Sequence, residues 1–99
     1  MKNITEAEHW QIVKFGELYK VFASWSGGYL DGDSWKLNSG IKSFVSKDDY
    51  FLFHGYSGSI YKCHKNMEGA NIYGAAVLSR WEEVELVDIE DFLKLDTIN

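Results

Sequence analysis

Apolar residues in this chain gather in short runs that are separated by segments containing glycine. The runs recur at intervals of roughly ten residues and are rich in β-branched and aromatic residues, a pattern typical of a small antiparallel β domain. The chain has no proline, and its nine glycines supply the breaks between the runs.

The first pair of runs allows two interpretations. The run Trp10–Phe15, followed by Gly16, is compatible with a helix that ends at a glycine. Ile12 and Val13 are β-branched, however, and favour a strand. We therefore predict a β-hairpin, in which the glycine and the glutamate after it form the turn to a second strand, Leu18–Trp25.

The middle of the chain predicts further strands. Trp35 begins a strand that a bulge at Gly40 extends to Val45. The clearest hairpin joins Tyr50–His54 to Ser59–Lys65 through a turn containing two glycines.

Both ends of the chain carry helix signals. Thr5 and Glu8 have the spacing of a capping box, which predicts a short helical turn at the start. Near the other end, Asp88 is predicted to cap a helix with an acidic first turn. So short a helix does not persist alone in water, and we expect Phe92 and Leu95 to pack on the sheet.

These elements predict one domain, residues 1–99, of the β-rich α+β class. Residues 75–81 fit either a strand or a helix, and residues 84–87 predict a last strand. Five or six antiparallel strands are expected to form a small sheet or barrel, with the short C-terminal helix across it. Hydrophobic residues make up 45% of the chain and aromatic residues 16%, enough for one core without metal or disulfide support.

The composition favours a cytoplasmic protein. Cys63 is the only cysteine, which excludes an intramolecular disulfide and a cysteine-based zinc site and suits a reducing compartment. The first residues lack the apolar stretch of a secretory signal, and no apolar run approaches the roughly 20 residues that span a bilayer. We therefore expect no membrane partner.

The net charge of −5 is concentrated near the C-terminus. Between Trp81 and Asp96, seven acidic residues stand against Lys94 alone. This excess argues against direct binding of nucleic acid, which depends on neutralising phosphates, and favours a partner with a basic surface. The alternative is a solvated acidic face that maintains solubility. The candidate partner-binding acids are Glu82, Glu83, Glu85, Glu90 and Asp91.

The sequence offers one pair of candidate catalytic groups, Cys63 and His64. Neighbours on a strand point to opposite faces, which separates the thiol from the imidazole. His54 on the partner strand is an alternative base, but no pattern supplies a lowered thiol pKa or an orienting third group. We therefore predict a half-buried strand cysteine, no catalytic residues and a protein that is not an enzyme.

No metal site or cofactor is predicted. The histidines and aspartates lack the spacing of zinc sites. Asp31 and Asp33 resemble the start of a calcium loop, but Trp35 occupies the next alternate position, where an oxygen ligand is needed. These aspartates are interpreted as turn residues.

The aromatic residues suggest a binding surface. The chain holds four Trp, six Tyr and six Phe, and Trp and Tyr are frequent at interface hot spots. The alternative is a core made mostly of rings. A small-ligand or carbohydrate-type site would gather aromatic and polar residues around one pocket: Trp25, Tyr29, Asp33, Trp35 and Asn38.

A resemblance to a known group rests on residues 23–41 (ASWSGGYLDGDSWKLNSGI), residues 55–65 (GYSGSIYKCHK) and Tyr73-Gly74. These segments resemble small accessory proteins encoded by phages and prophages, which mostly have no assigned activity. The resemblance covers roughly residues 20–80 and implies stoichiometric action on a host protein in the cytoplasm of an infected bacterium. We therefore expect an inhibitor of a bacterial defence system, of the anti-CRISPR or anti-restriction kind. Its acidic face would bind a basic protein surface, with Tyr29 and Asn38 as further contacts.

Overall fold

The computed structural model describes residues 4–26 and 34–95. Eight strands lie within these ranges: β1 (Ile4–Ala7), β2 (His9–Phe15), β3 (Leu18–Trp25), β4 (Ser34–Leu37), β5 (Ile41–Ser46), β6 (Tyr50–Gly55), β7 (Ile60–His64) and β8 (Val84–Val87). The helical elements are a 3-10 turn η1 (Lys65–Met67), α2 (Ile72–Leu78) and α3 (Ile89–Leu93). The β-rich α+β class and the short C-terminal helix are confirmed.

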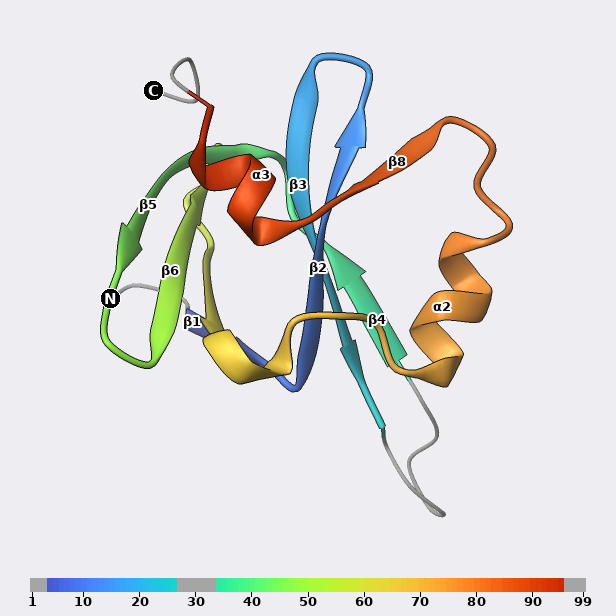
Figure 1. The fold of residues 1–99 in the computed structure, drawn as a ribbon, viewed down its shortest axis with the longest axis horizontal. Coiled ribbons are helices and arrows are strands. Elements are labelled where there is room, and N and C mark those ends of the chain that lie inside the picture. Colours follow the sequence, from blue (N-terminus) through green and yellow to red (C-terminus); the bar gives the residue numbers. More distant parts are fainter. Residues whose placement is uncertain (1–3, 27–33, 96–99) are drawn as a thin grey trace.

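The strands form two four-stranded sheets, which we name sheet A (β1-β7-β6-β5) and sheet B (β4-β3-β2-β8). In Figure 1, sheet A lies at the left, sheet B at the centre and α2 at the right, so sheet B is covered on both faces. The chain crosses between the sheets three times in the described residues, after β1, between β4 and β5, and between β7 and β8. In place of the expected sheet or barrel of five or six strands, the described residues form two four-stranded sheets that face each other.

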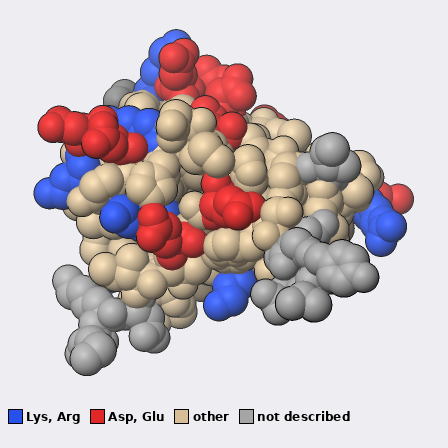
Figure 2. Space-filling model, turned by 90° about the horizontal axis from the view of Figure 1, so that it is seen from below, with Lys and Arg blue, Asp and Glu red and all other residues tan. Residues whose placement is uncertain are grey.

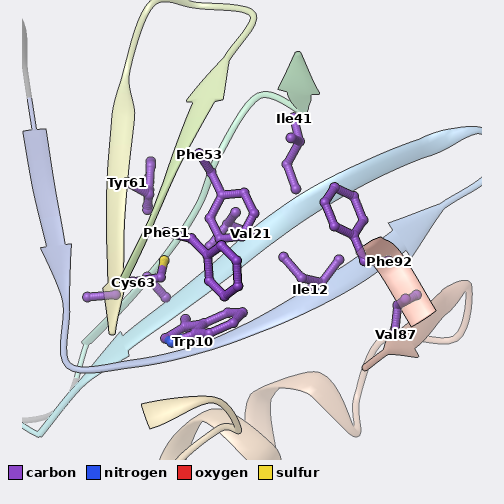
Figure 3. Packing of buried hydrophobic residues seen from close by; sticks show 12 residues of the cluster. Trp10, Ile12, Val21, Ile41, Phe51, Phe53, Tyr61, Cys63, Val87 and Phe92 are labelled. Carbon is purple, nitrogen blue, oxygen red and sulfur yellow. The ribbon is translucent and has the colours of Figure 1, made fainter. Parts of the chain in front are cut away.

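The core fills the space between the two sheets and α3 (Figure 3). Trp10 lies against Phe51 and Phe53, with ring centroids 6.0 and 5.8 Å apart, and Phe53 lies 6.0 Å from Phe92. Trp10, Phe53 and Phe92 have no exposed surface. Much of the aromatic content is therefore core packing, where each ring removes a large apolar area from water.

The first predicted hairpin is confirmed. β2 and β3 pair from His9 opposite Ser24 to Phe15 opposite Leu18. Gly16 has a φ of 56°, a left-handed conformation that glycine adopts without strain. The second hairpin, β6 with β7, is confirmed in the same way.

The helical turn predicted at Thr5–Glu8 is wrong. This segment lies largely in β1, which pairs in parallel with β7 and sets Ile4 opposite Ile60. The ladder satisfies several backbone groups and places Ala7 in the core. A capping box offers only two local bonds, so the long-range ladder prevails.

The strand predicted to run from Trp35 through a bulge at Gly40 to Val45 is also wrong. Its two halves are β4, at the edge of sheet B, and β5, at the edge of sheet A. Apolar and polar residues alternate both before and after residues 38–40, but the chain passes from sheet B to sheet A at these residues. A register shift does occur just after Gly40, in the pairing of β5 with β6, between Ile41 and Ser43.

The ambiguous apolar segment forms a helix. α2 begins after Asn71, whose Oδ1 accepts a hydrogen bond from Gly74 N at 2.7 Å. Gly74 lies directly on sheet B: a Cβ here would be 3.0 Å from the Phe22 ring and 3.1 Å from Ser24 Oγ. Glycine therefore allows the helix to approach the sheet closely.

The C-terminal helix packs as predicted but is capped differently. Phe92 is fully buried and Leu95 packs against the same cluster. Asp88 occupies the N-cap position without a side-chain capping bond. Ile89 N instead donates to Glu68 Oε2 at 2.7 Å, so the cap comes from the segment that precedes α2.

Candidate interaction surface

The outer face of sheet B carries a second aromatic cluster. Phe22 is stacked on Trp35 with centroids 5.6 Å apart, and Trp81 meets both rings edge-on, 5.7 Å from Phe22 and 5.1 Å from Trp35. Phe15 extends the cluster, 5.7 Å from Trp81. Trp35 retains 38% of its surface exposed and Trp81 is half-buried. These rings form an apolar surface that reaches solvent.

A groove of about 340 Å³ lies beside this cluster, between α2 and β8. Its lining is mostly apolar, and β2 contributes the polar side chain of Gln11. The residues that line the groove are Gln11, Ala70, Ala75, Leu78, Ser79, Trp81, Val84 and Leu86. Gln11 Nε2 donates to the backbone oxygens of Val87 and Ile12, at 2.9 and 3.2 Å, which holds β8 against β2.

β8 is an edge strand with two unlike sides. Leu86 lies opposite Val13, on the α2 side, while Val87 lies opposite Ile12, in the core between the sheets. Val84 shares the α2 side and belongs to its cluster. Leu86 is 58% exposed and lines the groove. Leu86, Val84 and Trp81 together line the groove, and a contiguous apolar patch of this kind marks a candidate contact site.

The structure divides the predicted acidic set. Glu82 and Glu83 are exposed and lie between Trp81 and Val84, both of which line the groove. Glu85 is exposed on the other side of β8, directly across from Lys14. Figure 2 shows a face on which acidic side chains lie in several groups with Lys or Arg beside most of them. Glu82 and Glu83 lie in the loop before β8, and Glu85 lies in β8 itself.

Glu90 and Asp91 lie in the first turn of α3. Carboxylates at this position interact favourably with the positive end of the helix dipole. This gives both residues a structural explanation that does not require a partner, whereas Glu82 and Glu83 lie outside any helix.

Trp25 and Trp35, two residues of the predicted ligand pocket, do not face one another. Trp25 pairs with Ser34, and Trp35 pairs with Ser24, so the two indoles lie on opposite faces of sheet B. Trp25 packs on the core between the sheets, and its Nε1 donates to Glu6 O at 2.9 Å. Neighbouring positions on paired strands alternate between faces, which separates the two rings.

Of the other residues of that predicted pocket, the structure describes Asn38. Asn38 is 4% exposed, and its Oδ1 accepts hydrogen bonds from Val21 N at 2.8 Å and Gly40 N at 3.3 Å. Its side chain therefore joins β3 to the crossing between the sheets. Tyr29 and Asp33 lie outside the described residues.

Cys63 is fully buried, not half-buried as predicted. Burial raises the pKa of its thiol strongly, which removes the thiolate that a nucleophile needs. His54 pairs with Ile60, and the residue opposite Cys63 is Phe51. The arrangement of Cys63 with His54, considered as a thiol and its base, is therefore wrong.

His64 faces the other side of β7 and meets a carboxylate. Its Nε2 lies 2.5 Å from Glu6 Oε2 on β1. The hydrogen bond from the His64 ring, with the nearby Lys62 charge, lowers the pKa of Glu6. Lys62 Nζ also lies 4.6 Å from the centre of the Tyr50 ring.

The described residues contain neither a metal-binding cluster nor a membrane-spanning helix. Across residues 4–26 and 34–95, no three His, Cys, Asp or Glu side chains are grouped so that they would hold a metal ion. In the same ranges, no helix has the length and apolar character required to cross a membrane.

Sequence reasoning missed two residues of the groove, Trp81 and Leu86. Trp81 is expected at the end of the ambiguous segment 75–81 and Leu86 in the last strand, neither of them as a named contact residue. One signal was present: Val84 and Leu86 alternate with Glu85, which is typical of a strand with one apolar side. The exposure of Leu86 follows from the edge position of β8, which local sequence does not reveal.

Comparisons with protein-family models, with curated proteins and with solved structures give no match to this chain.

Proposed function

We propose that the protein acts without catalysis, by binding a basic surface of another protein. The binding region is the β8 surface, defined as Trp81, Glu82, Glu83, Val84, Glu85 and Leu86. The observation that carries the proposal is the 58% exposed Leu86, which lies at an apolar groove with acidic residues on both sides of it in the sequence.

This combination resembles the anatomy of protein interfaces. Such interfaces have an apolar centre containing aromatic anchors, and a polar rim that excludes water and selects the partner. Trp81 and Leu86 would supply the centre and Glu82 and Glu83 the rim. Acidic rims accelerate encounter with basic partners and reject acidic ones.

The resemblance to phage accessory proteins suggests the setting of this interaction. We propose a bacterial partner in the cytoplasm of an infected cell, in a defence system whose nucleic-acid-binding surface is basic. Acidic side chains that occupy this surface would inhibit the system stoichiometrically. The protein would then be an inhibitor of the anti-CRISPR or anti-restriction kind. The deciding property is charge-dependent binding of a partner through the β8 surface, which is open to direct test.

The test compares two triple charge reversals as baits in a bacterial lysate. The first is Glu82→Lys/Glu83→Lys/Glu85→Lys, on the β8 surface. The second is Glu17→Lys/Asp48→Lys/Asp49→Lys, at exposed positions in the β2–β3 and β5–β6 turns. Both change the net charge by the same amount, so they separate local from global charge.

The wild type and the turn variant should capture the same partner at equal stoichiometry, and capture should weaken with added salt. The β8 variant should lose it while retaining the wild-type melting transition. Equal capture by all three folded proteins would refute the proposal, as would loss in both variants.

A further inference from the structure

On the outer side of β8, the described residues show no paired strand. In the strand order of sheet B, β8 pairs with β2 and ends the sheet. Figure 1 shows β8 running from the connection after α2 to the start of α3. Edge strands offer backbone donors and acceptors to any chain that can lie beside them.

A second copy of this chain is a poor occupant. Pairing of β8 with the β8 of another molecule would bring two copies of Glu85 close together, with Glu82 and Glu83 near the same edge. Like charges opposed across a strand pair are destabilising. The acids on and before β8 thus act against self-pairing and favour a chain of opposite charge.

The two sides of β8 place different demands on an added strand. On the α2 side, Val84 and Leu86 lie at the apolar groove. On the other side, Glu85 is exposed. Because side chains of an added strand also alternate, one side would present apolar residues to Leu86 and the groove, and the other would present cations to Glu85.

Building on the function proposed above, we infer that the partner contributes an extended segment of alternating apolar and basic residues, which pairs with β8 as a fifth strand of sheet B. Its apolar side chains occupy the α2–β8 groove, and its Lys or Arg side chains face Glu85. Backbone pairing provides affinity, and the alternation provides specificity.

The test titrates the isotopically labelled full chain with three capped heptapeptides and records its backbone amide NMR spectrum. The probe is Lys-Leu-Lys-Val-Lys-Leu-Lys. One control has the same composition in blocks, Lys-Lys-Lys-Lys-Leu-Val-Leu, and the other replaces each Lys by Glu. The blocked peptide separates strand periodicity from bulk charge and hydrophobicity.

Two variants of α2 locate the site. Ala75 and Ala76 are both exposed, but only Ala75 lines the groove. Ala75→Phe fills the groove from the helix, and Ala76→Phe adds the same ring elsewhere on α2.

The alternating Lys peptide should shift the amides of Val84–Val87 and bind at least about tenfold more tightly than either control peptide. Ala75→Phe should weaken its binding by a similar factor, and Ala76→Phe should leave it unchanged. Equal binding of the alternating and blocked peptides, shifts away from β8, or absence of binding at millimolar concentration would overturn the inference. None of these results affects the capture experiment, whose outcome decides the broader proposal separately.

Discussion

The backbone N–H of Ile89 donates a hydrogen bond to the carboxylate of Glu68 at 2.7 Å. This bond spans 21 residues and links the start of α3 to the segment between η1 and α2. It replaces the local cap that Asp88 was expected to provide, because the Asp88 side chain makes no capping bond. The C-terminal helix is therefore held at two points. The Phe92 side chain is buried in the core, and the Glu68 carboxylate binds the backbone N–H of Ile89 at the start of the helix.

Replacing Glu68 by Ala should destabilise the protein. The variant leaves Ile89 N without its acceptor, and loss of an N-terminal cap costs about 0.5–2 kcal/mol. Chemical denaturation of wild type and variant measures the difference. Asp88→Ala, at the position without a capping bond, is the matched control and should cost less. A larger loss for Asp88→Ala would show that the local cap dominates.

The elements that depend on neighbours in sequence were predictable. Both hairpins follow from strand runs that glycine turns separate, and α3 follows from an acidic first turn before Phe92. The two sheets were not predictable, because alternation is the same on either side of residues 38–40 although the chain changes sheet there. The parallel pairing of β1 with β7 joins positions 56 residues apart, such as Ile4 and Ile60, and leaves no local signal.

Asn38 is predicted to act through stability. Asn38→Ala removes the acceptor of the buried Val21 N–H, and an unsatisfied buried donor costs about 1–3 kcal/mol. Thermal unfolding measures this loss. Partner capture should fall only in proportion to the unfolded fraction. Loss of capture by a fully folded Asn38→Ala protein would contradict this and support a direct contact.

The thiol of Cys63 should be unreactive in the native protein. Its side chain has no exposed surface, and burial raises its pKa, so almost no thiolate is present at neutral pH. A chromogenic disulfide reagent should therefore react only after denaturant is added. Cys63→Ser should cost about 1–3 kcal/mol by burying a hydroxyl. Rapid labelling without denaturant would contradict the buried position.

The interaction between Glu6 and His64 should make the stability of the folded protein depend in part on acidic pH. Hydrogen bonding from His64, supported by Lys62, lowers the folded-state pKa of Glu6 below its ordinary value of 4.5. A depressed carboxyl pKa contributes stability above pH 4.5, and this contribution is lost as the pH falls from there through the folded-state value. Stability of Glu6→Gln should thus depend less on pH across this window. Glu17→Gln, in the exposed β2–β3 turn, should retain the wild-type profile. Identical acid profiles for wild type and Glu6→Gln would refute the assignment.

The candidate site was only partly visible in the sequence. The charge of Glu82, Glu83 and Glu85 is evident from composition, but the groove beside them needs α2 to lie against sheet B. That placement depends on Gly74, which a helix prediction treats as a weak helix former. Local propensity and tertiary packing therefore make opposite demands at this one position.

Gly74→Ala tests which demand prevails. Helix propensity alone predicts a gain of about 1 kcal/mol. A Cβ at this position would lie 3.0 Å from Phe22, 3.1 Å from Ser24 Oγ and 3.2 Å from Ala70 Cβ. Phe22 and Ser24 are fully buried and have little room to move, and overpacking of this kind costs about 1–3 kcal/mol. We therefore expect a net loss of stability in denaturant unfolding.

The exposed neighbour Ala76 provides the control for this experiment, because Ala76→Gly measures helix propensity without a packing change. It should destabilise α2 by about 1 kcal/mol. If Gly74→Ala instead stabilises the protein by the amount that Ala76→Gly removes, α2 does not rest closely on sheet B. The groove between α2 and β8, and the strand-binding inference that depends on it, would then fail together, whereas the charge-dependent capture by Glu82 and Glu83 would still stand on its own test.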